Sequence, residues 1–325
     1  MKNLSKSSKL TKAHVRIRTL TEKDLSDADR IFRLAFGTWH GLPDPLQFGS
    51  DANFCRTRWL IDATATFGAE IDGKLVGSNF VATWGNVGFF GPLTVLPDHW
   101  NKGIARQLMT ATVALFKDRG IVHSGCFTMP DSPKHHFLYQ EFGFWPRFLT
   151  PMMSLSIKPK AFPSYATYYS DTGDEDRDEI LTKCRNLTDA IFKGLDLEIE
   201  ITAVRHHGLG DTVLLWEDSR LAGFAVCHCG AQTEAGSDTC YIKFGAVRPG
   251  SGAEKRFDRL LDTCEAMAAD KGMSSLVAGM NAARHEAYRK MFERGFRTDM
   301  LGVIMQQPNE PGYNRPGVYV IDDWR

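Results

Sequence analysis

The chain has 325 residues, and its 39 Lys+Arg balance 39 Asp+Glu, so the formal net charge is zero. A protein that binds nucleic acid usually carries a strong basic excess, so this balance argues against that class of function. Hydrophobic residues make up 43% and charged residues 24% of the chain, which excludes disorder over most of its length. At about 100–200 residues per domain, the length predicts two domains.

The chain has the features of a cytoplasmic protein that is not inserted in a membrane. No segment approaches the roughly 20 apolar residues that a membrane-spanning helix needs. The basic stretch 1–13 lacks the apolar core of a secretory signal, and we expect a mobile tail there. The seven cysteines are scattered and odd in number, which does not indicate a disulfide framework. Cys227-His228-Cys229 continues an apolar run and is interpreted as part of a strand, with no metal expected.

In the first half, strand and helix patterns follow one another in a definite order. Thr21 is the expected N-cap of the first helix, with Asp24 in its first turn. Asp72-Gly73 is a two-residue hairpin signal. The stretch 37–53 is rich in Gly, Pro, Asp and aromatic residues and is expected to be a loop. Strands are predicted at 14–20, 67–71, 75–84, 87–95, 123–129 and 148–157, and further helices at 56–60, 104–115 and 135–142.

The same order begins again after 158–175, which we interpret as a linker because it carries Pro159, Pro163 and Gly173. A Val-x-Pro triplet and a later Gly-Phe pair occur in both halves at the same separation, ending at Pro97 and Phe144 and at Pro249 and Phe296. We therefore predict two copies of one α/β domain, each a mixed, mostly antiparallel sheet flanked by helices. They are expected at 14–157 and 176–325.

The stretch 91–105 is predicted to run from a strand through a turn into a helix. Gly103 and Ala105 keep the turn free of bulk, and the first N–H groups of the helix point outward without partners. Together with the helix dipole, such an end suits a pyrophosphate group. A tight turn that binds no ligand is the alternative interpretation of this pattern.

Two motifs give the first half a resemblance to the GNAT superfamily of N-acetyltransferases. The sequence Trp-Asn-Lys-Gly-Ile-Ala at 100–105 is similar to the family's acetyl-CoA signature Gln/Arg-x-x-Gly-x-Gly/Ala, with Trp100 in place of Gln or Arg. The sequence Leu-Tyr-Gln-Glu-Phe-Gly-Phe at 138–144 is similar to the family's downstream Leu-Tyr-x-x-x-Gly-Phe. The resemblance covers most of 15–157 and, as a degenerate copy, 175–306.

The resemblance implies direct transfer of an acetyl group from acetyl-CoA to a primary amine, without a metal. It implies that Tyr139 protonates the departing thiolate, which suits a phenol that is protonated at neutral pH. A helix aromatic packed in the core is the alternative for Tyr139. His135 lies one helical turn before Tyr139 and is the candidate base, with Asp98 and His99 as further candidates. The residues implied to contact acetyl-CoA are Leu93, Thr94, Val95, Asn101, Lys102, Gly103, Ile104, Ala105, Arg106 and Ser132, the last in a position where many members have Asn.

The acceptor pocket is expected to come from the loop between the first two helices. Trp39, His40 and Asp44 are its candidate residues, and the acceptor is a small-molecule amine or a protein lysine. In tandem members of the family the other domain often borders the acceptor site. The sequence leaves open whether the chain is a monomer or a homodimer.

The second copy is expected to have lost the chemistry of the first. Aligning Pro249 with Pro97 places Lys255 and Phe257 where the first copy has Gly103 and Ala105, so that bulky side chains would fill the phosphate turn. Met291 stands at the position of Tyr139 and cannot donate a proton.

We therefore expect one acetyl-CoA site, in the first domain, and a second domain that folds independently without binding acetyl-CoA. A shifted second site on Gly250-Ser251-Gly252 is one alternative. For the chain as a whole, the alternatives to an enzyme are a non-catalytic acyl-CoA sensor and a protein-interaction module.

Overall fold

The computed structural model describes residues 15–325, so the tail expected at 1–13 lies outside the described residues. No helix within the described part of the chain is long and apolar enough to cross a membrane. The helices are α1 (Leu25–Trp39), α2 (Phe54–Ile61), α3 (Ile104–Asp118), α4 (Pro133–Gln140), α5 (Arg177–Asp189), α6 (Glu198–His206), α7 (Ala253–Asp270) and α8 (His285–Arg294). The strands are β1 (Arg16–Thr19), β2 (Thr66–Ile71), β3 (Lys74–Trp84), β4 (Val87–Phe90), β5 (Thr94–Val95), β6 (His123–Thr128), β7 (Trp145–Ser156), β8 (Ala166–Tyr168), β9 (Gly210–Glu217), β10 (Arg220–Gly230), β11 (Gly236–Val247), β12 (Ser275–Gly279), β13 (Arg297–Gln307) and β14 (Val320–Ile321).

Local sequence signals account for most element boundaries. Thr21 and Asp24 form a capping box around the short 3-10 turn that precedes α1. Asp72 and Gly73 have φ values of 50° and 76°, which the hairpin between β2 and β3 requires. Helix α1 runs to Trp39, a few residues into the stretch expected to be a loop. The strand expected at 87–95 is divided into β4 and β5 at Gly91, where φ is 140°.

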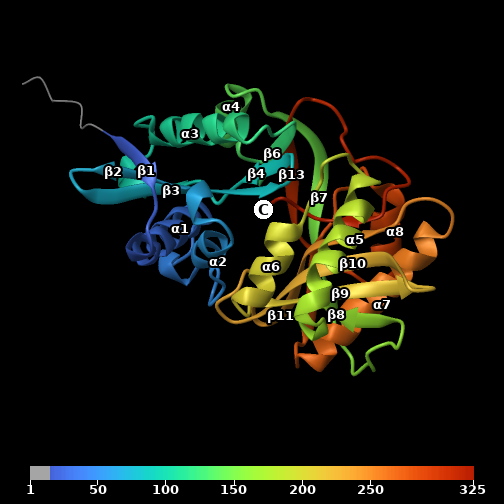
Figure 1. The fold of residues 1–325 in the computed structure, drawn as a ribbon. Coiled ribbons are helices and arrows are strands. Elements are labelled where there is room, and N and C mark those ends of the chain that lie inside the picture. Colours follow the sequence, from blue (N-terminus) through green and yellow to red (C-terminus); the bar gives the residue numbers. More distant parts are fainter. Residues whose placement is uncertain (1–14) are drawn as a thin grey trace, which may run out of the picture.

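All the strands belong to one sheet with the order β1-β2-β3-β4-β6-β13-β7-β12-β11-β10-β9-β8. The pairs β4–β6 and β11–β12 are parallel, and the other pairs along this order are antiparallel. Figure 1 shows α3 and α4 on one side of β3 and β4, with α1 and α2 on the other side. This confirms the expected mixed, mostly antiparallel sheet flanked by helices. Strand β8 lies within the stretch expected to be a linker and pairs with β9.

The two halves of the chain exchange strands. Strand β13, from the second half, lies between β6 and β7, and β7 lies between β13 and β12 (Figure 1). Val303 of β13 lies opposite Thr128 on one side and Leu149 on the other. In an isolated second half, β13 would have no partner strand, because both of its neighbours belong to the first half. The pairing therefore argues against the expectation that the second half folds independently.

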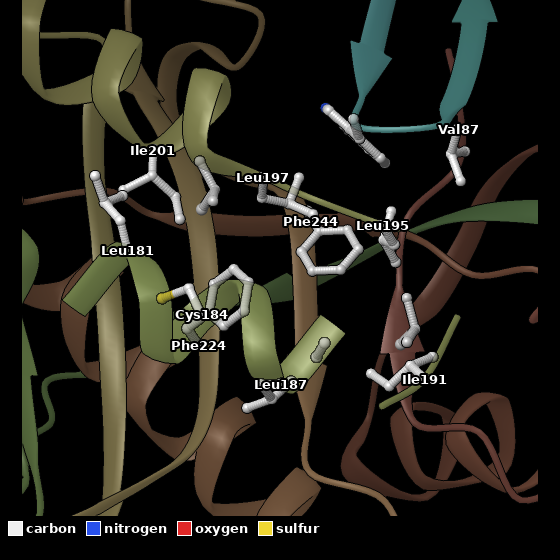
Figure 2. Packing of buried hydrophobic residues seen from close by; sticks show 14 of the residues in the cluster. Val87, Leu181, Cys184, Leu187, Ile191, Leu195, Leu197, Ile201, Phe224 and Phe244 are labelled. Carbon is white, nitrogen blue, oxygen red and sulfur yellow. The ribbon is translucent and has the colours of Figure 1, made fainter. Parts of the chain in front are cut away.

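A buried hydrophobic cluster joins the two halves on one face of the sheet. Leu195 and Leu197, which precede α6, lie on either side of Phe244 of β11, with Leu195 on the side of Val87 of β4 (Figure 2). The ring of Trp84, 1% exposed, meets those of Phe89 and Phe244 edge-on at 4.7 and 5.4 Å. Such close aromatic packing fixes the second half against the β3–β4 hairpin.

Candidate active site

A cavity opens in the first half because two parallel strands diverge. Strands β4 and β6 pair only as far as Phe89 and Gly125. Beyond that point the chain leaves β4 at Gly91 and continues as β5 beside β3, whereas β6 goes on to pair with β13. The resulting cavity has a volume of about 770 Å³. Its walls include Leu93, Thr94 and Val95 from one strand, and Phe127 and Thr128 from the other.

The diverging strand leaves main-chain groups free to bind a ligand. The N–H of Leu96 donates to the carbonyl oxygen of Val76 in β3, at 2.9 Å. Because successive N–H groups of a strand point to opposite sides, the N–H of Val95 faces away from β3 and toward β6. That N–H is therefore directed into the cavity.

The turn after β5 has the geometry of an anion site. Gly103 is the N-cap of α3 with φ of 78°, and open space surrounds the position that a Cβ would take. The first hydrogen bond within the helix runs from Gln107 to Gly103, and for the main-chain N–H groups at 104–106 the structure records no acceptor among residues 15–325. These N–H groups and the helix dipole together suit a phosphate group.

Trp100, which departs from the family signature, has a structural role in this turn. Its indole Nε1 donates to the carbonyl oxygen of Val95 at 2.7 Å, which holds the turn against β5. Asn101, Ile104, Ala105 and Arg106 line the cavity, and Arg106 also forms an exposed ion pair with Glu141. Lys102 does not line the cavity, and its Nζ donates to the carbonyl oxygen of Asp98 at 2.8 Å.

Tyr139 and His135 lie side by side on α4 and both line the cavity. The ring of Tyr139 is 6% exposed, stacks on His135 at 6.1 Å and meets Phe90 edge-on at 5.3 Å. Burial, and next the thiol of Cys126, raises the pKa of Tyr139 well above its usual value. The phenol therefore stays protonated and remains a possible proton donor.

His135 is held by a neighbouring hydroxyl and remains neutral at neutral pH. Its Nδ1 lies 2.8 Å from the Oγ of Ser132, which also lines the cavity. Burial, followed by the charges of Lys134 and His136, lowers the pKa of His135. A neutral imidazole of this kind has a free lone pair on one nitrogen and can accept a proton. The structure thus brings the predicted acid and base together.

An aromatic wall forms the end of the cavity where the sequence predicts the acceptor pocket. Trp39 and His40 line it, together with a group of stacked rings from α1, α2 and the loop between them, namely Phe32, Phe36, Phe48 and Phe54. Asp44 does not line the cavity, because its carboxylate accepts the N–H of Leu46 at 3.1 Å and caps a 3-10 turn. The sequence reasoning missed the Phe rings, although their density between 32 and 54 was a visible signal.

The second half supplies the far wall of the same cavity. Its lining residues there are Glu234, Ala235, Thr239, Val277, Met300 and Arg325. The carboxylate of Glu234 pairs with the buried guanidinium of Arg58 at 3.0 Å and with Lys243 at 2.8 Å. Burial opposes ionisation of Glu234, but these two cations lower its pKa well below the usual range. Sequence analysis alone had no signal for these residues, because they lie far from the motifs along the chain.

The corresponding turn of the second half differs from the sequence-based alignment. Gly252 is the N-cap of α7 with φ of 82°, and so it corresponds to Gly103. Lys255 and Phe257 lie inside α7, where Phe257 is fully buried in the core, so the expectation that they fill the phosphate turn is wrong. Instead, the guanidinium of Arg256 lies over the turn and donates to the carbonyl oxygen of Ser251 at 3.0 Å.

The second half has no open gap between its own parallel strands. Strands β11 and β12 pair as far as Ile242 and Ala278, and β14 then pairs with β11 at Gly245 and Ala246. The buried guanidinium of Arg284 holds the β14 segment in place. It donates to the carbonyl oxygens of Val320 and Asp322 at 2.9 and 3.0 Å and pairs with the Asp322 carboxylate at 2.6 Å. The chain itself thus fills the place where the first half has its cavity.

Comparisons with known proteins agree with this geometry. The acetyltransferase (GNAT) family profile matches residues 28–144. No curated protein sequence matches the chain. Among solved structures, a Pyrococcus horikoshii protein described as an acetyltransferase is 13% identical, with a TM-score of 0.67 and 95% of each chain covered.

Two further solved structures also match along almost their whole length. A GCN5-related N-acetyltransferase from Sphaerobacter thermophilus is 14% identical, with a TM-score of 0.56, covering 90% of this chain and 95% of that one. A tandem GNAT protein from the clavulanic acid biosynthesis pathway is 12% identical, with a TM-score of 0.53, covering 90% of this chain and 98% of that one. Residues 28–144 therefore match the acetyltransferase (GNAT) family, and over at least 90% of its length the chain has the fold of a tandem GNAT protein.

Proposed function

We propose that this N-acetyltransferase binds one acetyl-CoA per chain, in the cavity of the first half. The observation that carries the proposal is the contrast between the two halves. The gap between β4 and β6 is open, whereas the equivalent gap between β11 and β12 is filled by β14. Both halves keep a glycine N-cap at the phosphate turn, so the turn alone does not distinguish them.

In this proposal the main chain holds most of the acetyl-CoA. The free N–H groups at 104–106 bind the pyrophosphate, and the N–H groups of Leu93 and Val95 bind the pantetheine arm and the thioester oxygen. Lys134, whose Nζ lies 5.4 Å from the centre of the Trp100 ring, adds positive charge beside the turn. None of these contacts needs the Gln or Arg that Trp100 replaces.

Chemistry then requires a base for the amine and an acid for the thiolate. The nitrogen of the acceptor forms a bond to the acetyl carbonyl carbon, and the bond from that carbon to sulfur breaks. His135 takes the proton that the amine loses, directly or through a water. Tyr139 donates its phenolic proton to the departing thiolate, a role that its place on the cavity wall beside His135 supports. The acceptor amine enters from the aromatic wall formed by α1 and α2.

Titration calorimetry with acetyl-CoA tests this proposal, using two matched variants. Gly103→Glu adds bulk and negative charge beside the pyrophosphate and should weaken binding at least a hundred-fold. Gly252→Glu makes the same change at the equivalent turn of the second half and should leave affinity unchanged. The parent should bind one acetyl-CoA per chain. A stoichiometry near two, or loss of binding only in Gly252→Glu, would contradict the proposal.

An amine-acetylation assay separates an enzyme from an acyl-CoA sensor. The parent should acetylate at least one member of a panel of amino acids, polyamines, amino sugars and lysine peptides. Tight binding of acetyl-CoA without turnover of any of them would favour sensing.

A further inference from the structure

The acceptor end of the cavity contains a cluster of buried charges in which most groups already have partners. Arg58 donates from Nε to Glu234 and from its two Nη atoms to the main-chain oxygens of Gly91 and Arg325. Lys243 donates to the other oxygen of Glu234 at 2.8 Å. Glu234 is thus saturated by two cations, and it has no capacity left to attract the amine of an acceptor.

Arg325 is the exception in this cluster. The nearest carboxylate oxygen, on Asp323, lies 3.7 Å from its Nε, and that Nε makes no hydrogen bond. Its guanidinium carbon lies 4.1 Å from the centre of the Tyr241 ring, which fixes the group by a cation–π contact. The side chain is 21% exposed and lines the cavity. It therefore presents a positioned cation to whatever occupies this end.

The carboxylate nearest to Arg325 is already held by other donors. Asp323 accepts hydrogen bonds from the hydroxyl of Tyr241 at 3.0 Å and from the main-chain N–H of Arg325 at 2.9 Å. Three cations, Arg58, Lys243 and Arg325, face the carboxylates of Glu234 and Asp323, and Arg58 and Lys243 also donate to the main-chain oxygen of Arg325. Glu200 lies near the same cluster, but burial raises its pKa to about 7, so it is only partly ionised near neutral pH.

Arg325 lies close to the point where the acetyl group would be presented. A single guanidinium, that of Arg58, bridges the main-chain oxygens of Gly91 and Arg325. Gly91 follows β4 directly, where the strands begin to diverge and where Phe90 meets Tyr139. The main chain of Arg325 is thus one guanidinium away from Gly91, and both residues line the same cavity. The remaining wall consists of the rings of Phe32, Phe36, Phe48 and Phe54, which suits an apolar body.

From this geometry we propose that the acceptor is a free amino acid with a large apolar side chain, whose carboxylate pairs with Arg325 and whose side chain packs on the Phe rings. An α-amino acid has its amine and carboxylate on one carbon, which matches the short separation between Arg325 and the diverging strands. The guanidinium offers the two-pronged hydrogen bonding that a carboxylate accepts. This inference rests on the proposed function, because it assumes that the acetyl group lies beside Tyr139.

Acceptors with and without a carboxylate test whether that group contributes to recognition. With acetyl-CoA and the full chain, we expect kcat/KM for L-phenylalanine to exceed that for L-phenylalaninamide and for phenethylamine at least ten-fold. Both comparison amines keep the ring and lack the carboxylate. Arg325→Gln should abolish this preference, and Arg325→Lys should keep part of it, because a lysine retains the charge and loses the planar fork. Arg289→Gln, on the exposed face of α8, is the matched control and should keep the full preference.

The preference is a ratio measured on one preparation, so partial misfolding of a variant does not change it. Equal turnover of L-phenylalanine and its amide by the parent would overturn the inference, as would an unchanged preference in Arg325→Gln. If acetyl-CoA binds and a polyamine or a lysine peptide is acetylated while amino acids are not, this inference fails and the proposed function stands. If Gly103→Glu leaves acetyl-CoA binding intact, the proposed function itself fails.

Discussion

Burial gives Tyr139 and His135 different protonation states at the same pH, although they belong to one short helix. Removing a phenol from water disfavours its anion, so Tyr139 keeps its proton. Removing an imidazole from water disfavours its cation, so His135 loses its proton. A protonated acid beside a neutral base is the pair that acetyl transfer to an amine needs.

Replacing Tyr139 by Phe tests the acid directly, because it keeps the ring packed on Phe90 and removes only the hydroxyl. We expect kcat to fall by roughly a hundred- to ten-thousand-fold, the range for a positioned acid, with acetyl-CoA affinity little changed. Steady-state kinetics and calorimetry on the same variant provide the two measurements. Unchanged kcat, where chemistry limits the rate, would show that Tyr139 only packs in the core.

The pH dependence of kcat tests His135 as the base. Its folded-state pKa lies below the usual 6.5, so the neutral, active form persists at pH 6.5 and is lost only as the pH falls through that lowered value. We expect kcat to be level from about pH 6.5 upward and to decline on the acid side, and His135→Gln to remove this acid limb along with most of the activity. An acid limb that persists in the variant would assign the base to another group.

At the scale of elements, one strand decides which half has a cavity. β14 fills the second gap and is fixed there by Arg284, which is fully buried among partners that also lie inside the protein. The chain then continues through Trp324, whose carbonyl oxygen accepts the N–H of Phe127 at 3.2 Å in the first half. The segment that closes the second gap therefore also carries Arg325 to the floor of the first.

Arg284→Met should destabilise the whole protein, because it leaves the Asp322 carboxylate buried without its cation. Breaking a buried pair in this way costs about 3–5 kcal/mol, which should lower the midpoint of thermal unfolding by several degrees. Arg289→Met, which breaks only an exposed pair with Glu293, should change the midpoint little. Equal midpoints for the two variants in differential scanning fluorimetry would show that β14 does not depend on Arg284.

The elements could be predicted from the sequence where their signals are local. The capping residues Thr21 and Asp24, the Asp72-Gly73 hairpin and the helical spacing after Gly103 act within a few positions, so a single segment carries each of them. The position of the phosphate turn before α7 could not be predicted from the spacing of the motifs, because two differences in length cancel. That turn is shorter than the first, whereas α7 has 18 residues and α3 has 15, so the separation from Pro249 to Gly295 looks unchanged.

The strand exchange and the far wall of the cavity could not be predicted in this way. β7 and β13 have similar apolar patterns, and nothing in either pattern states which neighbour it will pair with. Likewise, Arg58 and Glu234 are 176 positions apart, and only the folded chain brings them into contact. Long-range partners of this kind depend on the whole fold rather than on any one segment.

At the scale of the whole molecule, the exchange of β7 and β13 interleaves the two halves around one cavity. β13 crosses from the second half into the sheet of the first, and β7 does the reverse, while the cavity takes its walls from both. This arrangement explains why a second half without an open gap of its own is retained. It supplies both a strand and a cavity wall to the half in which we propose that acetyl-CoA binds.

Cutting the connection between the halves tests this unity. Residues 158–161 are exposed and belong to no helix or strand, so a protease site inserted between Pro159 and Lys160 should be cleaved without loss of structure. We expect the two fragments to elute together in size-exclusion chromatography and to bind acetyl-CoA as the uncut chain does. The interleaved β7 and β13 hold them together by main-chain hydrogen bonds along almost their whole length. The same fragments expressed separately should aggregate, because each then exposes an unpaired strand. Fragments that separate after cleavage, or a second fragment that folds alone, would show that the exchanged strands are dispensable.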